Sequence, residues 1–241
     1  MMRKQSVALF LLWAFAWSPA AAIETWSTFD SGLEGWTLAG NGSLSHDPEG
    51  GNPGGYARFG DAWGPHGDGW LVAPAEFLGD WSALDAVGML FWDHRVINGG
   101  EGPTYLRAQA AFSGPGGSAI FTSSDLLGHG WRSFSAPIAE SAWNVSGDWN
   151  ALLNNVTELR IRIEGVHNVG PRLDIDGIDN VLLTSYGDLN ADGCVDHADL
   201  GILLGDWDCT GQDCVGDIDG DGATDHADLG ILLAHWGDGC P

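Results

Sequence analysis

The stretch Asp188-Leu-Asn-Ala-Asp-Gly-Cys-Val-Asp-His-Ala-Asp199 returns 29 residues later as Asp217-Ile-Asp-Gly-Asp-Gly-Ala-Thr-Asp-His-Ala-Asp228, and Leu-Gly-Ile-Leu-Leu follows both copies. Each copy has oxygen-bearing side chains at positions 1, 3, 5, 9 and 12 and glycine at position 6. Oxygen ligands at these intervals suit a hard cation such as calcium, and the glycine permits the sharp turn around it. The sequence therefore predicts two calcium loops, over 188–199 and 217–228.

Each loop follows the EF-hand-type pattern with one change. Aspartate stands at position 12 in place of the usual glutamate, so the loop must close more tightly for the shorter side chain to reach the ion. Position 7 contributes a backbone carbonyl whatever its side chain. The expected ligands are Asp188, Asn190, Asp192, the carbonyl of Cys194, Asp196 and Asp199 in the first loop, and Asp217, Asp219, Asp221, the carbonyl of Ala223, Asp225 and Asp228 in the second.

An amphipathic helix is predicted directly after each loop and none before it. From 188 to 241 the chain has 13 aspartates and no Lys, Arg or Glu, so closing both loops without cations would bring strong self-repulsion. Calcium is therefore expected to contribute much of the folding free energy, and the apolar stripes argue against a disordered acidic tail. The stripes have i, i+3, i+4, i+7 spacing and comprise Leu200, Leu203, Leu204 and Trp207, then Leu229, Leu232, Leu233 and Trp236.

Residues 187–237 resemble a type I dockerin, whose paired loop–helix repeats dock onto cohesin modules. The resemblance implies a small all-α module, a cohesin-like partner, and partner contacts at loop positions 10 and 11, here His197, Ala198, His226 and Ala227. Dockerins often carry hydroxyl and basic residues there and along the helix, whereas these helices lack Lys and Arg. The alternative is that both histidines are simply solvent-facing residues at the helix starts.

The N-terminal residues and the cysteines indicate an exported protein. Arg3 and Lys4 precede an apolar run over 7–17 and the small residues 20–22, so 1–22 is predicted to be a secretory signal peptide. That run is too short for a membrane-spanning helix. In an exported chain, Cys194, Cys209, Cys214 and Cys240 favour disulfides. Spacing leaves three connectivities open, of which we expect Cys209 with Cys214 and Cys194 with Cys240.

The charge excludes two classes of partner. With 9 Lys+Arg against 33 Asp+Glu, the formal net charge is −24, and the cations are scattered beyond the N-terminal pair. Nucleic-acid binding needs a basic face, and anionic membrane surfaces attract basic segments. Neither nucleic acid nor membrane insertion is therefore expected.

Between 25 and 184, short apolar or alternating stretches recur between Gly, Pro, Asn and Asp clusters, which favours an antiparallel β-sandwich or jelly roll. The segment 159–164 alternates apolar with charged residues, so one of its faces is expected to be buried and the other charged. One short helix is expected over 148–155, with Ser146 or Asp148 as its cap.

Three blocks of this region resemble the laminin B domain, also called laminin domain IV: Phe29-Asp-Ser-Gly-Leu-Glu-Gly-Trp36, Trp70-Leu-Val-Ala-Pro-Ala-Glu-Phe-Leu-Gly-Asp80 and Val156-Thr-Glu-Leu-Arg-Ile-Arg162, the last followed by 173–183. The resemblance covers nearly all of 26–184. It implies a jelly-roll-like module of extracellular proteins with no established catalytic role and a ligand that varies.

A further calcium ion is one interpretation of Asp174-Ile-Asp-Gly-Ile-Asp-Asn-Val181, since galactose-binding-like sandwiches often hold one between such a strand and the N-terminal segment. Asp30 and Asp179 are then the expected ligands. The alternative is that Asp176, Gly177 and Asn180 form a turn or bulge.

Catalysis finds little support in the motifs. A glycosidase needs two carboxyls flanking a cleft, and the available residues, Asp93, Glu101, Glu140 and Glu164, lie in no recognisable catalytic block. His94 is expected to form a surface pair with Asp93. No Gly-x-Ser-x-Gly or His-Glu-x-x-His motif occurs.

Tryptophans favour a binding role. Those in polar or glycine-rich contexts, Trp63, Trp143 and Trp149, are expected to offer flat faces to sugar rings or peptides. Those in predicted strands are expected to lie in the core: Trp26, Trp36, Trp70, Trp92 and Trp131.

Together the patterns predict a mainly β, secreted, calcium-binding protein without catalytic activity. A jelly-roll-like sandwich over 25–184 is expected to bind extracellular matrix or polysaccharide, and a dockerin-like module over 187–237 is expected to mediate docking. Two alternatives remain open. One is a subunit of a polysaccharide-degrading complex with glycoside hydrolase activity, and the other is a purely structural surface protein.

Overall fold

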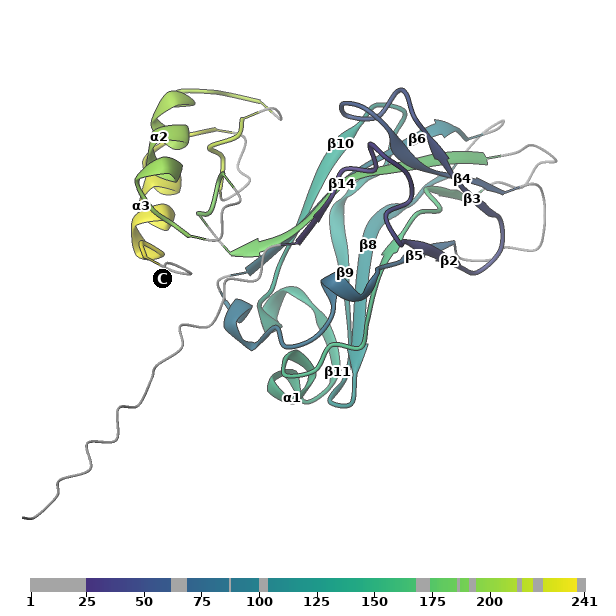
Figure 1. Ribbon diagram of the computed structural model, residues 1–241, viewed down its shortest axis with the longest axis horizontal. Coiled ribbons are helices and arrows are strands. Elements are labelled where there is room, and N and C mark those ends of the chain that lie inside the picture. The colour runs from purple at the N-terminus through teal and green to yellow at the C-terminus, as the bar shows by residue number, and fades with distance from the viewer. Residues whose placement is uncertain are drawn as a thin grey trace, which may run out of the picture.

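The computed structural model describes residues 25–61, 69–86, 88–99, 104–167, 174–185, 187–190, 194–211, 214–218 and 223–237. The expected signal peptide lies outside these residues. Figure 1 shows two β-sheets packed face to face and, beside one end of the long strand β14, a pair of short helices. The expectation of a mainly β sandwich followed by a small helical unit is confirmed at this level. In the described residues no helix is long and apolar enough to cross a membrane.

Sheet A has the strand order β10-β6-β14-β4-β3, with β1 also paired to β14, and all its pairings are antiparallel. The long strands β6 and β14 form its centre. Its strands are β1 (Thr25–Ser27), β3 (Ser43–Asp47), β4 (Tyr56–Asp61), β6 (Gly88–Asn98), β10 (Arg132–Pro137) and β14 (Asp174–Ser185).

Sheet B has the order β11-β9-β8-β12-β5-β2 and is also antiparallel. A separate two-stranded ribbon joins β7 (Thr104–Tyr105) to β13 (Val166–His167). The strands of sheet B are β2 (Thr37–Ala39), β5 (Trp70–Val72), β8 (Arg107–Gly114), β9 (Gly117–Leu126), β11 (Asn144–Gly147) and β12 (Glu158–Arg162).

Short helical segments lie between the strands of the sandwich. The predicted helix is present as α1 (Trp149–Leu153), and the Asp148 side chain caps it by accepting a hydrogen bond from the Ala151 N–H. Such a cap satisfies one of the free N–H groups at a helix start. Three 3-10 turns occur at η1 (Ala75–Phe77), η2 (Ser82–Leu84) and η3 (Glu140–Ala142).

The core lies between the two sheets. On β12, Leu159 and Ile161 are fully buried, whereas Arg160 and Arg162 are partly exposed, which confirms the predicted alternation. Trp36 and Trp92 are core residues as expected. Trp26 is not: it is 65% exposed, because β1 pairs only at the margin of the sheet and Trp26 points outward. The expectation is also wrong for Trp70 and Trp131, which are only partly buried.

The C-terminal helices are α2 (His197–Gly205) and α3 (His226–Ala234). Both begin three residues before the predicted stripe, within the last turn of the predicted loop, and they enclose a small core of Val195, Leu203, Ile218 and Leu232. Fewer residues of each apolar stripe are buried than expected, since Leu204 and Leu233 are about half exposed. The disulfide between Cys209 and Cys214 is confirmed. The second expected pairing involves Cys240, which lies outside the described residues.

Candidate ligand-binding face and calcium loops

The outer face of sheet B carries rows of polar side chains that run across the strands. Arg162 on β12 donates from Nη1 to Oε1 of Gln109 on β8 at 2.9 Å, and Gln109 Nε2 donates to Thr122 Oγ1 on β9 at 3.0 Å. Trp70 on β5 is the register partner of Arg162 on the other side and is partly exposed. One aromatic side chain, one guanidinium, one amide and one hydroxyl therefore form a continuous row.

A second set of polar groups surrounds a shallow hollow on the same face, of about 420 Å³. Its charged pair is Glu158 and Arg160, in which Arg160 Nε lies 2.7 Å from Oε1 and Nη2 lies 2.8 Å from Oε2. Neutral hydrogen-bonding groups come from the three neighbouring strands, namely Ser113, Ser118, Asn144 and Ser146.

Chemically, this face offers donors and acceptors at strand spacing on a rigid support. Hydroxyl, amide and guanidinium groups can bond the hydroxyls of an extended ligand, and the strands fix their positions. Of these residues, the sequence analysis singled out the charged side of 159–164 and Trp70, and it wrongly expected Trp70 in the core. The polar residues of β8, β9 and β11 carry no motif, and only the register of the strands brings them together.

Two of the expected ligand-binding tryptophans are not available on the surface. Trp143 and Trp149 are 6% and 5% exposed, and both pack edge-on against Phe112. Their indole N–H groups donate to Pro137 O at 2.6 Å and Asp85 Oδ1 at 2.8 Å. The expectation is wrong for these two side chains, because satisfied indole N–H groups let both rings join the core despite their polar neighbours. Trp63 lies outside the described residues.

Asp30 and Asp179, the expected ligands of the sandwich, do lie in one cluster, under the 50–55 loop. Asp179 Oδ2 accepts the Asn52 N–H at 2.6 Å, and Asp30 Oδ1 accepts the Gly55 N–H at 3.3 Å. Asp93 completes the cluster: Asn52 Nδ2 donates to its Oδ2 at 3.1 Å. Through these hydrogen bonds, the three carboxylates hold the 50–55 loop against sheet A.

Burial raises the pKa of Asp179 to about 6, against the lowering effect of its two backbone hydrogen bonds, and the neighbouring charges of Asp93 and Asp30 raise it further. The register shift between Asp179 and Leu182 and the positive φ of Asn180 show the predicted bulge. Because the carboxylates already accept N–H and O–H donors, the geometry explains their clustering without an ion. Calcium at Asp30 and Asp179 stays a prediction.

The two tail loops are closed by their position-12 aspartates, which are both fully buried. Asp199 Oδ1 accepts the Leu189 and Asn190 N–H groups at 2.7 and 3.1 Å, and its Oδ2 accepts the Asp196 N–H at 2.7 Å. Asp228 repeats this arrangement with the N–H groups of Ile218, at 2.7 Å, and Asp225, at 2.8 Å. Each carboxylate thus joins the start of its loop to the start of its helix.

The donor set of these loops fits a hard cation. Asp188 is buried in the first loop, position 12 is buried in both, and the sequence provides no cationic side chain other than histidine in this part of the chain. Asp192, Asp219 and Asp221 lie outside the described residues. Calcium binding by the loops stays a prediction.

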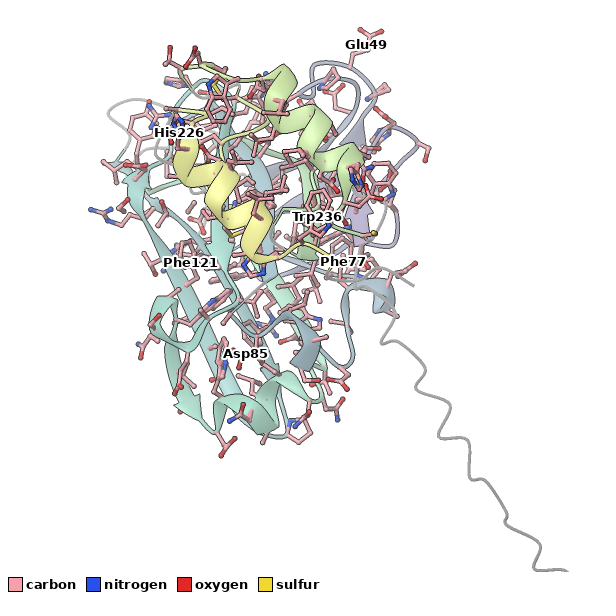
Figure 2. The ribbon with its side chains drawn as sticks, turned by 90° about the vertical axis from the view of Figure 1, so that its left-hand side faces the viewer. Glu49, Phe77, Asp85, Phe121, His226 and Trp236 are labelled. Atoms are coloured by element: carbon pink, nitrogen blue, oxygen red, sulfur yellow. A yellow bond between two sulfur atoms is a disulfide. The ribbon has the colours of Figure 1, made fainter. Side chains whose placement is uncertain are left out.

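The expected partner residues His197, Ala198, His226 and Ala227 are all exposed at the two helix starts. Their histidines also connect the repeats. The His197 ring packs edge-on against Trp236 at 4.9 Å between centroids, and the His226 ring against Trp207 at 5.0 Å. Figure 2 looks onto these helices, with His226 and Trp236 labelled at opposite ends of α3. Neither of the two interpretations of the histidines included this internal contact.

The carboxylates considered for hydrolysis do not gather in the hollow. Asp93 is buried and accepts a hydrogen bond from Ser133 Oγ at 2.6 Å, and Glu164 is buried and accepts the Gly69 N–H at 3.2 Å. Glu140 lies on η3, and Glu101 is outside the described residues. His94 is fully buried, so the expected surface pair with Asp93 is wrong: β6 turns the two side chains to opposite faces of sheet A.

No family model and no curated protein matches the chain. Among solved structures, it is similar to the family 11 carbohydrate-binding module of the cellulosomal cellulase Lic26A-Cel5E of Clostridium thermocellum, with a TM-score of 0.45 and 16% identity over 69% of this chain and 96% of that one. It is also similar to the CBM22-1 xylan-binding domain of Xyn10C from Paenibacillus barcinonensis, with a TM-score of 0.45 and 11% identity over 70% and 97%. A third similar structure is the L4b domain of human laminin alpha-2, with a TM-score of 0.45 and 13% identity over 69% and 99%.

Proposed function

We propose that this chain is a secreted, non-catalytic polysaccharide-binding protein whose ligand lies across the outer face of sheet B. The proposal rests on one row of hydrogen-bonded side chains, which runs from Arg162 through Gln109 to Thr122. This row lies beside the polar hollow around Arg160. A chain of sugars presents hydroxyls at regular intervals, and rows of side chains on successive strands match such a ligand better than a compact one.

The carboxylates of this face support binding rather than hydrolysis. Glycoside hydrolysis uses two carboxyl groups on either side of the scissile bond. Among the residues that line the hollow, Glu158 is the only acid, and it is already paired with Arg160. The residues that line the hollow therefore lack the second carboxyl group that hydrolysis needs.

For the tail we propose calcium-dependent docking to a cohesin-like partner. Its support is the duplication of loop and helix together with the exposed Leu204 and Leu233, which occupy equivalent positions in the two repeats. Exposed leucines on a two-fold surface suit a protein partner. Export by the N-terminal segment belongs to the same proposal.

The test of the sandwich proposal is affinity electrophoresis of the full chain in gels that contain soluble polysaccharides. At least one polysaccharide should retard the protein, and Gln109→Ala should weaken that binding by about tenfold, since it removes a hydrogen bond to each neighbouring strand. The matched control is Ser45→Ala on the outer face of sheet A, which should bind as the parent does. No retardation by any polysaccharide, or release of new reducing ends, would contradict the proposal.

A further inference from the structure

Positive charge is concentrated on the proposed binding face, in a chain with a net charge of −24. Three of the six arginines that the structure describes, Arg107, Arg160 and Arg162, lie on the adjacent strands β8 and β12 with their side chains on the outer side of sheet B. The described strands β5, β8, β9, β11 and β12 carry two carboxylates, Glu158, which pairs with Arg160, and Asp125 near the end of β9.

Two of these guanidinium groups have N–H donors that remain available to a ligand. Arg160 Nη2 donates to Glu158 Oε2, its Nε lies 2.7 Å from Oε1 without forming a hydrogen bond, and no described residue accepts a hydrogen bond from its Nη1. Arg107 is exposed and donates only from Nη1, to Ser123 O at 3.2 Å. A guanidinium fork can match a carboxylate with two parallel hydrogen bonds.

We propose, on the basis of the proposed function, that the polysaccharide bound here is acidic and carries the carboxylates of uronic acid residues. A neutral chain would leave the spare donors of Arg107 and Arg160 bonded to water. A carboxylate on the ligand would use them and would offset the positive charge of the face.

The negative charge of the rest of the protein does not oppose this assignment at physiological salt. Screening there acts over about 8 Å, so carboxylates elsewhere on the molecule contribute little at the face while the arginines in contact with the ligand act fully. The charge contrast instead favours a polyanion at this face over the remaining surface.

The experiment titrates the full chain, with calcium present, against a soluble polyuronate, a neutral glucan and a sulfated galactan. The polyuronate should bind about tenfold more tightly than the glucan, and its affinity should fall as sodium chloride is raised. Arg107→Gln should weaken polyuronate binding several-fold, and this change removes no contact with a carboxylate of the protein itself. Arg160→Gln should do the same, whereas Arg58→Gln on β4 of sheet A is the matched control and should have no effect.

The outcomes separate the two proposals. Equal affinity for glucan and polyuronate, or no effect of Arg107→Gln, would overturn the assignment of an acidic ligand and leave the binding face in place. Preference for the sulfated galactan would overturn the choice of carboxylate. Binding to none of the three, together with no retardation in the wider panel, would overturn the proposed function itself.

Discussion

His94 and Asp176 are two ionisable residues placed inside the sandwich core. Both are fully buried, with His94 Nε2 3.9 Å from Asp176 Oδ1 and 3.2 Å from Ile163 O. Burial lowers the pKa of His94 to about 3 and raises the pKa of Asp176 well above its usual value. Desolvation favours the neutral form of each group in the folded protein.

The pH dependence of stability should report on this pair, and Asp176→Asn isolates one half of it. The folded state keeps a proton on Asp176 that the unfolded state loses above a pH of about 4, so Asp176 makes stability fall as pH rises, by up to about 1.4 kcal/mol per unit. His94 has the opposite effect, because its unfolded state gains a proton below a pH of about 6.5. Between these values the two effects cancel.

Urea denaturation of the parent and Asp176→Asn at several pH values between 4 and 8.5 checks this expectation. The variant should gain stability relative to the parent as pH rises, most clearly above neutrality. A constant difference between the two curves at all pH values would show that Asp176 is ionised in the folded protein.

Phe112 on β8 is the residue on which three buried tryptophans from the connecting segments converge. Its ring lies 5.0, 4.7 and 5.7 Å from those of Trp81, Trp143 and Trp149. Phe112→Ala should therefore cost about 3–5 kcal/mol of unfolding free energy, since the cavity would remove contacts with all three rings. Phe121→Ala, at a half-buried position on β9, should cost clearly less. Equal losses in chemical denaturation would rule out this central role.

At the scale of elements, each tail helix is joined to its loop by one carboxylate. Asp199→Asn should abolish calcium binding to the first loop, because it weakens the ligand set and also the hydrogen bonds to the loop and helix N–H groups. Calcium titration calorimetry of the full chain should then show one ion fewer than the parent. Asp208→Asn, an exposed change just after α2, is the control and should keep the parent's stoichiometry. Unchanged binding in Asp199→Asn would refute the ligand assignment.

The elements differ in how well sequence predicts them. The repeat and its apolar stripes predicted the existence of α2 and α3, because helical periodicity is a local signal, but both helices start three residues earlier than expected, behind the capping aspartates Asp196 and Asp225. The alternation of 159–164 likewise gave the correct buried face of β12. By contrast, the burial of Trp143 and the exposure of Trp26 depend on which strands lie at the sheet margin. The rows of polar side chains on the outer face of sheet B depend on the register between its strands. Neither property is encoded in a short window of sequence.

On the scale of the whole molecule, the acidic loops and the arginine-bearing face lie in different parts of the chain. Removing calcium with a chelator should therefore reduce the helical signal of the tail and leave polysaccharide affinity of the full chain unchanged. Circular dichroism and affinity electrophoresis on the same samples measure both. Loss of polysaccharide binding on chelation would show instead that calcium supports the sandwich, which would favour an ion at Asp30 and Asp179.

The proposed function makes the outer face of sheet B the binding face. Hydrogen exchange of the full chain, with and without the tightest-binding polysaccharide, tests it most directly, because ligand contact slows local opening of the strands it covers. We predict added protection in peptides from β8, β9 and β12 and no change in β3 and β4 of sheet A. Protection confined to sheet A or to the tail would contradict the account.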